Sequence, residues 1–74
     1  MAKLRVFSGR ELIRLLTEQG FQEVRSRGSH VVLQRSSGGG TITVPVPDHA
    51  EIKRGTLQSI IRQSRLPRSM FEVE

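Results

Sequence analysis

Arg27-Gly28-Ser29-His30-Val31-Val32-Leu33 is the stretch around which this 74-residue sequence is organised. Gly28 and Ser29 predict a turn, and the apolar run after them predicts a strand that begins at His30. Histidine is the side chain whose proton is exchanged near neutral pH, and arginines flank it in this sequence. The stretch therefore indicates a proton-transfer group beside an anion, most simply a phosphate.

Length and composition limit the chain to one small domain, residues 1–74. The sequence has no cysteine, so neither a disulfide framework nor a thiolate metal site is available to it. No apolar run reaches the roughly 20 residues of a membrane span, and the N-terminal residues lack the apolar region of a signal peptide. We therefore expect a cytoplasmic protein, with no membrane partner, that is stabilised by a compact apolar core.

The charge of the chain bears on its partner. Twelve Lys and Arg residues against seven Asp and Glu give a net charge of +5, and lysine occurs only at positions 3 and 53. Arginine presents a planar fork of donors that suits phosphate, so a basic, arginine-rich domain favours a nucleic-acid partner. The alternative is that the arginine content only reflects the base composition of the gene.

A helix is predicted over residues 9–19. Ser8 and Glu11 have the spacing of a capping box, in which each side chain accepts the backbone N–H of the other residue. The apolar residues between Leu12 and Leu16 follow helical spacing, and Gly20 is typical of the residue that follows the last turn.

Three antiparallel strands are predicted next, over residues 22–26, 30–35 and 41–46. The glycine-rich residues 36–40 are expected to form a flexible hairpin loop. Alternation from Ile42 to Val46 directs every second residue of the third strand to the core, and Pro45 indicates that this strand lies at an edge of the sheet. The second strand carries apolar residues on both faces, so alternation alone does not decide which way His30 points.

The second half of the chain predicts a short helical turn and a longer helix. Asp48 is placed to cap a turn over residues 48–51, and a helix follows over residues 54–64 with a buried stripe from Leu57 to Ile61. Met70-Phe71 is expected to fold back onto the core. The order of elements predicts an α+β fold, in which two helices cover one face of a three-stranded antiparallel sheet.

Several short stretches share their order and spacing with one protein family, and they are Gly20-Phe21, Gly28-Ser29-His30, Val46-Pro47-Asp48-His49, Gly55-Thr56-Leu57 and Ser59-Ile60-Ile61. From Ser8 to Phe71 the chain resembles the HicA family of small bacterial toxins from toxin–antitoxin pairs. The resemblance implies a fold similar to the double-stranded-RNA-binding domain and cleavage of messenger RNA without a metal. It also implies inhibition by a HicB-type antitoxin, and it identifies His30 as the catalytic histidine.

The chemistry of RNA is compatible with this resemblance. RNA is cleaved without a metal when its own 2′-OH attacks the adjacent phosphorus, and a positioned histidine accelerates such a step by roughly 10²–10⁴-fold as acid or base. The alternative for His30 is a partly buried histidine bonded to backbone. His49 is a possible second acid or base, and its alternatives are a turn residue or a partner of Asp48. Two scattered histidines without a carboxylate cluster are a poor ligand set, so no metal site is predicted. We also expect no small-molecule cofactor.

Six residues are candidates for contacts with RNA, namely Arg25, Arg27, Ser29, Arg35, Lys53 and Arg54. The three arginines are expected to flank His30 on the strands. The two residues at the start of the second helix are expected to use its positive dipole end, where anions bind readily. Some of the cations are alternatively solvated surface charges, Ser29 is alternatively a turn residue, and Arg10 on the first helix is expected to be ordinary solvated surface.

The sequence thus predicts a metal-independent endoribonuclease toxin that is masked by an antitoxin. Two alternatives stay open, a non-catalytic double-stranded-RNA-binding module and a protein-interaction domain that depends on a partner. Cleavage separates the first alternative from the prediction. Ionic strength separates the second, because binding through several phosphates weakens steeply with salt.

Overall fold

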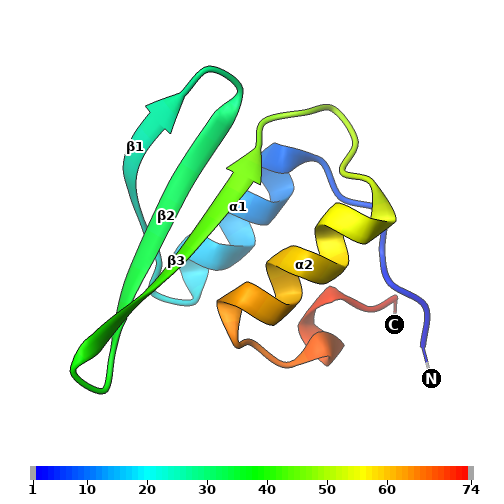
Figure 1. The fold of residues 1–74 in the computed structure, drawn as a ribbon. Coiled ribbons are helices and arrows are strands. Elements are labelled where there is room, and N and C mark those ends of the chain that lie inside the picture. The colour runs from blue at the N-terminus through cyan, green and yellow to red at the C-terminus, as the bar shows by residue number, and fades with distance from the viewer. Residues whose placement is uncertain (1, 74) are drawn as a thin grey trace.

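The structure is a computed structural model that describes residues 2–73, and it confirms the predicted α-β-β-β-α order. Its elements are α1 (Gly9–Glu18), β1 (Gln22–Arg27), β2 (His30–Ser37), β3 (Gly40–Pro47), α2 (Arg54–Ser64) and a short 3-10 helix, η1 (Arg68–Phe71). The three strands form one antiparallel sheet in the order β1-β2-β3, with β3 at an edge as Pro45 predicted (Figure 1).

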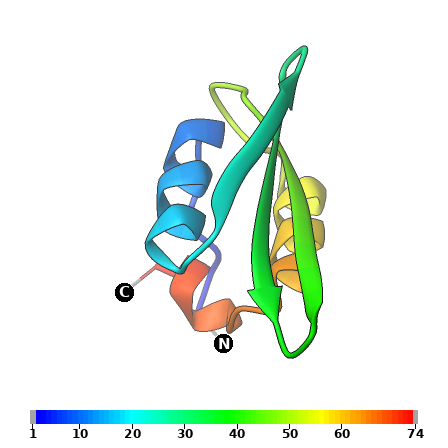
Figure 2. The same cartoon turned by 90° about the vertical axis from the view of Figure 1, so that its left-hand side faces the viewer.

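The two helices cover one face of the sheet. Val31 and Leu33 of β2 are buried, and so are the residues opposite them on β3, Val46 and Val44. The residues that alternate with them point to the other face, which we call the open face and which includes His30. In Figure 2 the strands run in front, with α1 to their left and α2 to their right, partly hidden by the strands. The predicted layer arrangement is therefore confirmed, and the structure shows that His30 points away from the helices.

Local signals set both ends of α1. The backbone N–H of Ser8 donates to Glu11 Oε1 at 2.8 Å and the N–H of Glu11 donates to Ser8 Oγ at 3.1 Å, so the predicted capping box is present. At the other end Gly20 has φ of +94°, and the N–H of Phe21 donates to the carbonyl of Leu16 at 3.0 Å. This is the bonding of a Schellman motif, as predicted.

The segment before α1 pairs with the end of the chain. The N–H of Arg5 donates to the carbonyl of Phe71, and the N–H of Val73 donates to the carbonyl of Lys3, both at 2.8 Å. Phe7 and Phe71 are both buried and meet edge to face, with ring centroids 6.0 Å apart. The chain therefore returns to the core at Phe71 as predicted, whereas the pairing of its two ends had no signal in the sequence.

The hairpin loop predicted over residues 36–40 is shorter in the structure. Ser37 and Gly40 are paired, which leaves Gly38 and Gly39 as a two-residue turn with φ of +52° and +86°. Two positive φ angles are typical of a type I′ turn, whose twist matches that of antiparallel strands. The glycines therefore extend the two strands around a tight turn and do not form a flexible loop.

The predicted helical turn over residues 48–51 is wrong. Asp48 does not cap a helix; its N–H donates to the carbonyl of Ser29, and its carboxylate lies 3.1 Å from Arg10. These long-range contacts hold the segment in a bent, non-helical conformation, which the local signal at Asp48 did not show. They also show that Arg10 is not merely solvated surface.

Candidate functional site

His30 lies at one end of the open face, where β1 turns into β2. Its cross-strand partners are Arg27 on β1 and Pro47 on β3, and Arg25 is paired with Val32 in the same way. Directly opposed residues in a sheet point to the same face, so both arginines share the open face with His30. All three side chains belong to exposed residues. The structure therefore brings together His30, the predicted proton-transfer group, and two of the cations that the sequence predicted beside it.

A two-residue turn holds His30 at this position. Gly28 has φ of +59°, and Ser29 is not among the residues with positive φ, which is the pattern of a type II′ turn. The carbonyl of Ser29 accepts the N–H of Asp48, so the ladder between β2 and β3 continues one bond beyond Pro47. The turn at Ser29 is thus fastened to the segment that follows β3.

His49 lies on that same segment, and its residue is exposed. It is two residues beyond Pro47, the partner of His30. Paired Cα atoms are at most about 5.5 Å apart and two residues span at most about 7 Å, so the Cα atoms of His30 and His49 lie within roughly 13 Å. The structure therefore brings both histidines of the chain to one end of the sheet.

Lys53 and Arg54 stand at the start of α2. Lys53 is the N-cap residue, and α2 has neither a side-chain cap at this end nor an acidic residue in its first turn. Both residues are exposed. The uncapped start of α2 and two exposed cations therefore lie together, which is the arrangement that suits an anion.

Arg35 does not lie beside His30, contrary to the prediction. It is five residues further along β2, which corresponds to roughly 16 Å of extended strand. Its Nη1 donates to the carbonyl of Gln19 at 3.1 Å, and its guanidinium lies 5.1 Å from the centre of the Phe21 ring. Arg35 is therefore engaged at the end of α1, at the opposite end of the strand from the histidine.

The sequence of this chain matches a known protein family. A family model described as the HicA toxin of bacterial toxin–antitoxin matches residues 9–66, which is most of the chain. The chain belongs to the HicA toxin family. A search of curated proteins gives no match. Members of the HicA family are toxins of toxin–antitoxin systems, so this chain is a HicA-like toxin for which a cognate antitoxin is implied as partner.

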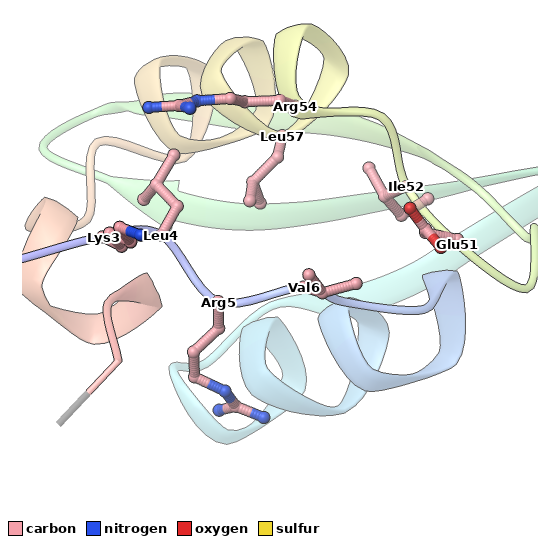
Figure 3. A pocket seen from close by; sticks show the side chains of 8 residues that line it. All are labelled: Lys3, Leu4, Arg5, Val6, Glu51, Ile52, Arg54 and Leu57. Atoms are coloured by element: carbon pink, nitrogen blue, oxygen red, sulfur yellow. The ribbon is translucent and has the colours of Figure 1, made fainter.

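The residues matched to the HicA family include every candidate site residue. They do not include the N-terminal segment, which lines a cleft of about 360 Å³ against the start of α2 together with Arg54. Figure 3 shows Leu4 and Leu57 extending into this cleft, with Arg54 along α2 at its rim. Neither histidine lines it. The candidate site of this HicA protein is thus an exposed surface at the end of the sheet and not an enclosed pocket.

The pKa of Glu11, at the start of α1, is lowered below its usual 4.5. The main cause is the hydrogen bond from the backbone N–H of Ser8; the Ser8 side chain and the nearby charges of Arg5 and Arg14 act in the same direction.

Between residues 2 and 73 no group of three or more His, Cys, Asp or Glu is placed to hold a metal ion. No helix in that part of the chain is long and apolar enough to cross a membrane.

Sequence reasoning missed Gly9 and Arg10 as parts of this region and gave Asp48 a different role, that of a helix cap. Gly9 donates its N–H to the carbonyl of His49 at 2.8 Å, and Arg10 pairs with Asp48. The signal that was available was the placement of Gly9 directly after a helix cap, where a small residue permits close approach of another segment. The sequence did not show which segment approaches.

Proposed function

We propose that this HicA-family toxin is an endoribonuclease that cleaves messenger RNA, with His30 as its general acid or base. The observation that carries the proposal is the exposure of His30 on the open face directly opposite Arg27. Membership of a toxin family supports a harmful activity that a cognate antitoxin restrains. The basic composition, with a net charge of +5, supports a nucleic-acid substrate.

The proposed reaction is an intramolecular transesterification. The 2′-OH of the substrate loses its proton to a base and its oxygen forms a bond to the adjacent phosphorus. The bond from phosphorus to the 5′-oxygen breaks, and that oxygen takes up a proton from an acid. The products are a 2′,3′-cyclic phosphate and a 5′-hydroxyl. The bonds that form and break all belong to the RNA, so the protein need supply only proton transfer and charge stabilisation. His30 serves as one of the two proton-transfer groups.

Arg27 and Arg25 stabilise the negative charge that develops on the phosphorane. Both share the open face with His30, and guanidinium groups donate to phosphate oxygens in a planar fork. Lys53 and Arg54 hold more distant phosphates at the start of α2, and the Ser29 hydroxyl donates to the phosphate beside His30. These contacts read backbone and shape, as is common for structured RNA.

His49 is the proposed second proton-transfer group. It is fixed near His30 because its carbonyl accepts the N–H of Gly9 at 2.8 Å and because its neighbour Asp48 bonds to Ser29. One histidine then takes the proton of the 2′-OH while the other supplies a proton to the leaving oxygen.

The unit of function that we propose is a single HicA-like domain over residues 1–74. One continuous core supports it, since buried side chains from both helices, two strands and η1 form one cluster. Because messenger RNA is the proposed substrate, we expect the toxin to act in the cytoplasm, without a small-molecule cofactor.

The test is cleavage of an RNA that carries 2′-deoxyribose at the scissile nucleotide and ribose elsewhere. The proposal expects the all-ribose RNA to be cut and the modified RNA to be bound but left intact. Equal cleavage of the two would exclude the transesterification. Binding of both RNAs without any cleavage would favour a non-catalytic RNA-binding module.

A further inference from the structure

Residues 47–49, which we call the 47–49 turn, bond to two parts of the molecule that are distant from it in sequence. These parts are the start of α1 and the hairpin that carries His30. On one side the N–H of Asp48 donates to the carbonyl of Ser29, the residue before His30. On the other side the carbonyl of His49 accepts the N–H of Gly9 at 2.8 Å, at the first residue of α1. The 47–49 turn thus lies between the start of α1 and the two-residue turn, Gly28-Ser29, that precedes His30.

The fit between α1 and the 47–49 turn is close. A Cβ atom at Gly9 would overlap the carbonyl oxygen of Pro47 and would lie 2.8 Å from the Cα of Asp48. Real Cβ atoms are essentially never so near to backbone atoms, so the helix and the turn are in direct backbone contact. The position of the turn is therefore set by the position of α1.

An ion pair joins the same two parts. Arg10 Nη2 lies 3.1 Å from Asp48 Oδ2, and the Asp48 side chain is 30% exposed whereas that of Arg10 is 76% exposed. Such a surface pair contributes little to global stability. Its effect is local, because the carboxylate that it holds belongs to the residue whose N–H bonds to Ser29.

The β2–β3 ladder holds the hairpin up to His30, which is paired with Pro47, and the bond from Asp48 extends this support to the turn at Ser29. All six residues of β1 are exposed, so β1 contributes no buried side chain that would fix its end of the sheet. The bond from Asp48 to Ser29 anchors the hairpin at the turn itself. Reaction rates are sensitive to displacements of a catalytic group by about 1 Å.

We propose that Arg10 and Asp48 are positioning residues for His30, acting through the 47–49 turn. The inference rests on the proposed function, because it concerns the rate at which His30 acts. Arg10 holds the carboxylate of Asp48, Asp48 holds Ser29, and the turn at Ser29 presents His30 to the phosphate. Neither Arg10 nor Asp48 needs to touch RNA in this arrangement.

The experiment compares the variants Arg10→Met and Asp48→Asn with a matched control, Arg14→Met. Arg14 is an exposed arginine one helical turn beyond Arg10. Rates of cleavage of a labelled messenger RNA give kcat and KM separately, and amide hydrogen exchange reports on the N–H of Asp48. A double variant with exchanged charges, Arg10→Asp with Asp48→Arg, tests whether the pair itself matters.

The proposal expects kcat to fall by about tenfold in both single variants, since a displacement of about 1 Å costs up to about 100-fold. KM should stay within about twofold, exchange at Asp48 should accelerate, and the charge exchange should recover most of kcat. The control should match the wild type. An unchanged kcat in both single variants would overturn the proposal. A raised KM with unchanged kcat would also overturn it, because that result assigns Arg10 to RNA binding.

Failure of the proposed function gives a different result. If the wild type does not cut RNA in any condition while His30→Ala binds RNA as the wild type does, the endoribonuclease proposal fails. The exchange measurement then decides the structural link alone. Faster exchange at Asp48 in Arg10→Met than in Arg14→Met supports the link, and equal exchange in the two variants refutes it.

Discussion

Arg27 and His30 face each other across the two-residue turn formed by Gly28 and Ser29. Opposed side chains in an antiparallel pair have Cβ atoms about 4.5–5.5 Å apart on the same face of the sheet. A phosphate that reaches the imidazole of His30 is thus within reach of the guanidinium of Arg27. In the proposed mechanism the hairpin thus supplies both the proton-transfer group, His30, and the charge-stabilising group, Arg27, from an exposed surface.

The substitution Arg27→Ala should lower kcat/KM for messenger RNA cleavage by about 10–100-fold. The phosphorane would lose a preorganised donor, and the loss of one such donor is commonly of this size or larger. Arg27→Lys should recover only part of the rate, because lysine lacks the planar fork. The control is Arg62→Ala on α2, where the guanidinium donates to Ser59. Equal losses at Arg27 and Arg62 would contradict the assignment.

Removal of the two cations at the start of α2 should change the salt dependence of RNA binding. In a His30→Ala background, the additional changes Lys53→Ala and Arg54→Ala should reduce the slope of log K against log salt by about 0.7 for each lost phosphate contact on single-stranded RNA. Arg35→Met should leave the slope unchanged, because Arg35 is engaged with Gln19 and Phe21. A lower slope in Arg35→Met, with no change in the Lys53→Ala and Arg54→Ala variant, would contradict this assignment and would place the phosphate contact at Arg35.

Two glycine-to-alanine substitutions should have opposite effects on stability. Gly9→Ala should lower the free energy of unfolding by about 1–3 kcal/mol, because the added methyl group overlaps the backbone of Pro47. Gly55→Ala on α2 should raise it by up to about 1 kcal/mol, because the new methyl group would meet no atom within 4 Å beyond its chain neighbours and the local helix backbone, and because alanine favours the helix. Urea unfolding measures both changes in the free energy of unfolding. A Gly55→Ala protein less stable than the wild type would contradict a helical, uncrowded position for Gly55 in the first turn of α2.

The capping box at Ser8 and Glu11 should make stability depend on pH. The folded state lowers the pKa of Glu11 from its usual 4.5, chiefly through the hydrogen bond from the Ser8 backbone. The ionised carboxylate therefore stabilises the protein above the unfolded pKa, and this contribution is lost as the pH falls through the lowered folded value. Urea unfolding of wild type and Glu11→Gln should show a larger advantage for the wild type at pH 7 than in acid. A constant difference across pH would exclude this role.

Local signals in the sequence were reliable because they depend on neighbouring residues. The capping box at Ser8, the Schellman ending at Gly20 and the edge position of Pro45 are each fixed within a few residues, and all are present in the structure. The order of elements followed from these signals and from the spacing of apolar residues. The helix predicted over residues 9–19 ends one residue earlier in the structure.

Long-range contacts decided what the sequence left open or predicted wrongly. The face of His30 followed from the register between β2 and β3, since Val31 and Val32 are both apolar and alternation could not separate them. Asp48 has the local signal of a helix cap, but its partners are Arg10 and Ser29, each far away along the chain. Arg35 shares a strand with His30, yet the length of that strand separates them.

The most direct test of the account is cleavage of a labelled messenger RNA in EDTA by the wild type and by His30→Ala. The account predicts that the wild type yields fragments with 2′,3′-cyclic phosphate ends. It also predicts that His30→Ala keeps its fold and its salt-sensitive binding of RNA but produces no fragments. Cleavage at equal rates by the two proteins would contradict the central role of His30 and would make His49 the next histidine to test.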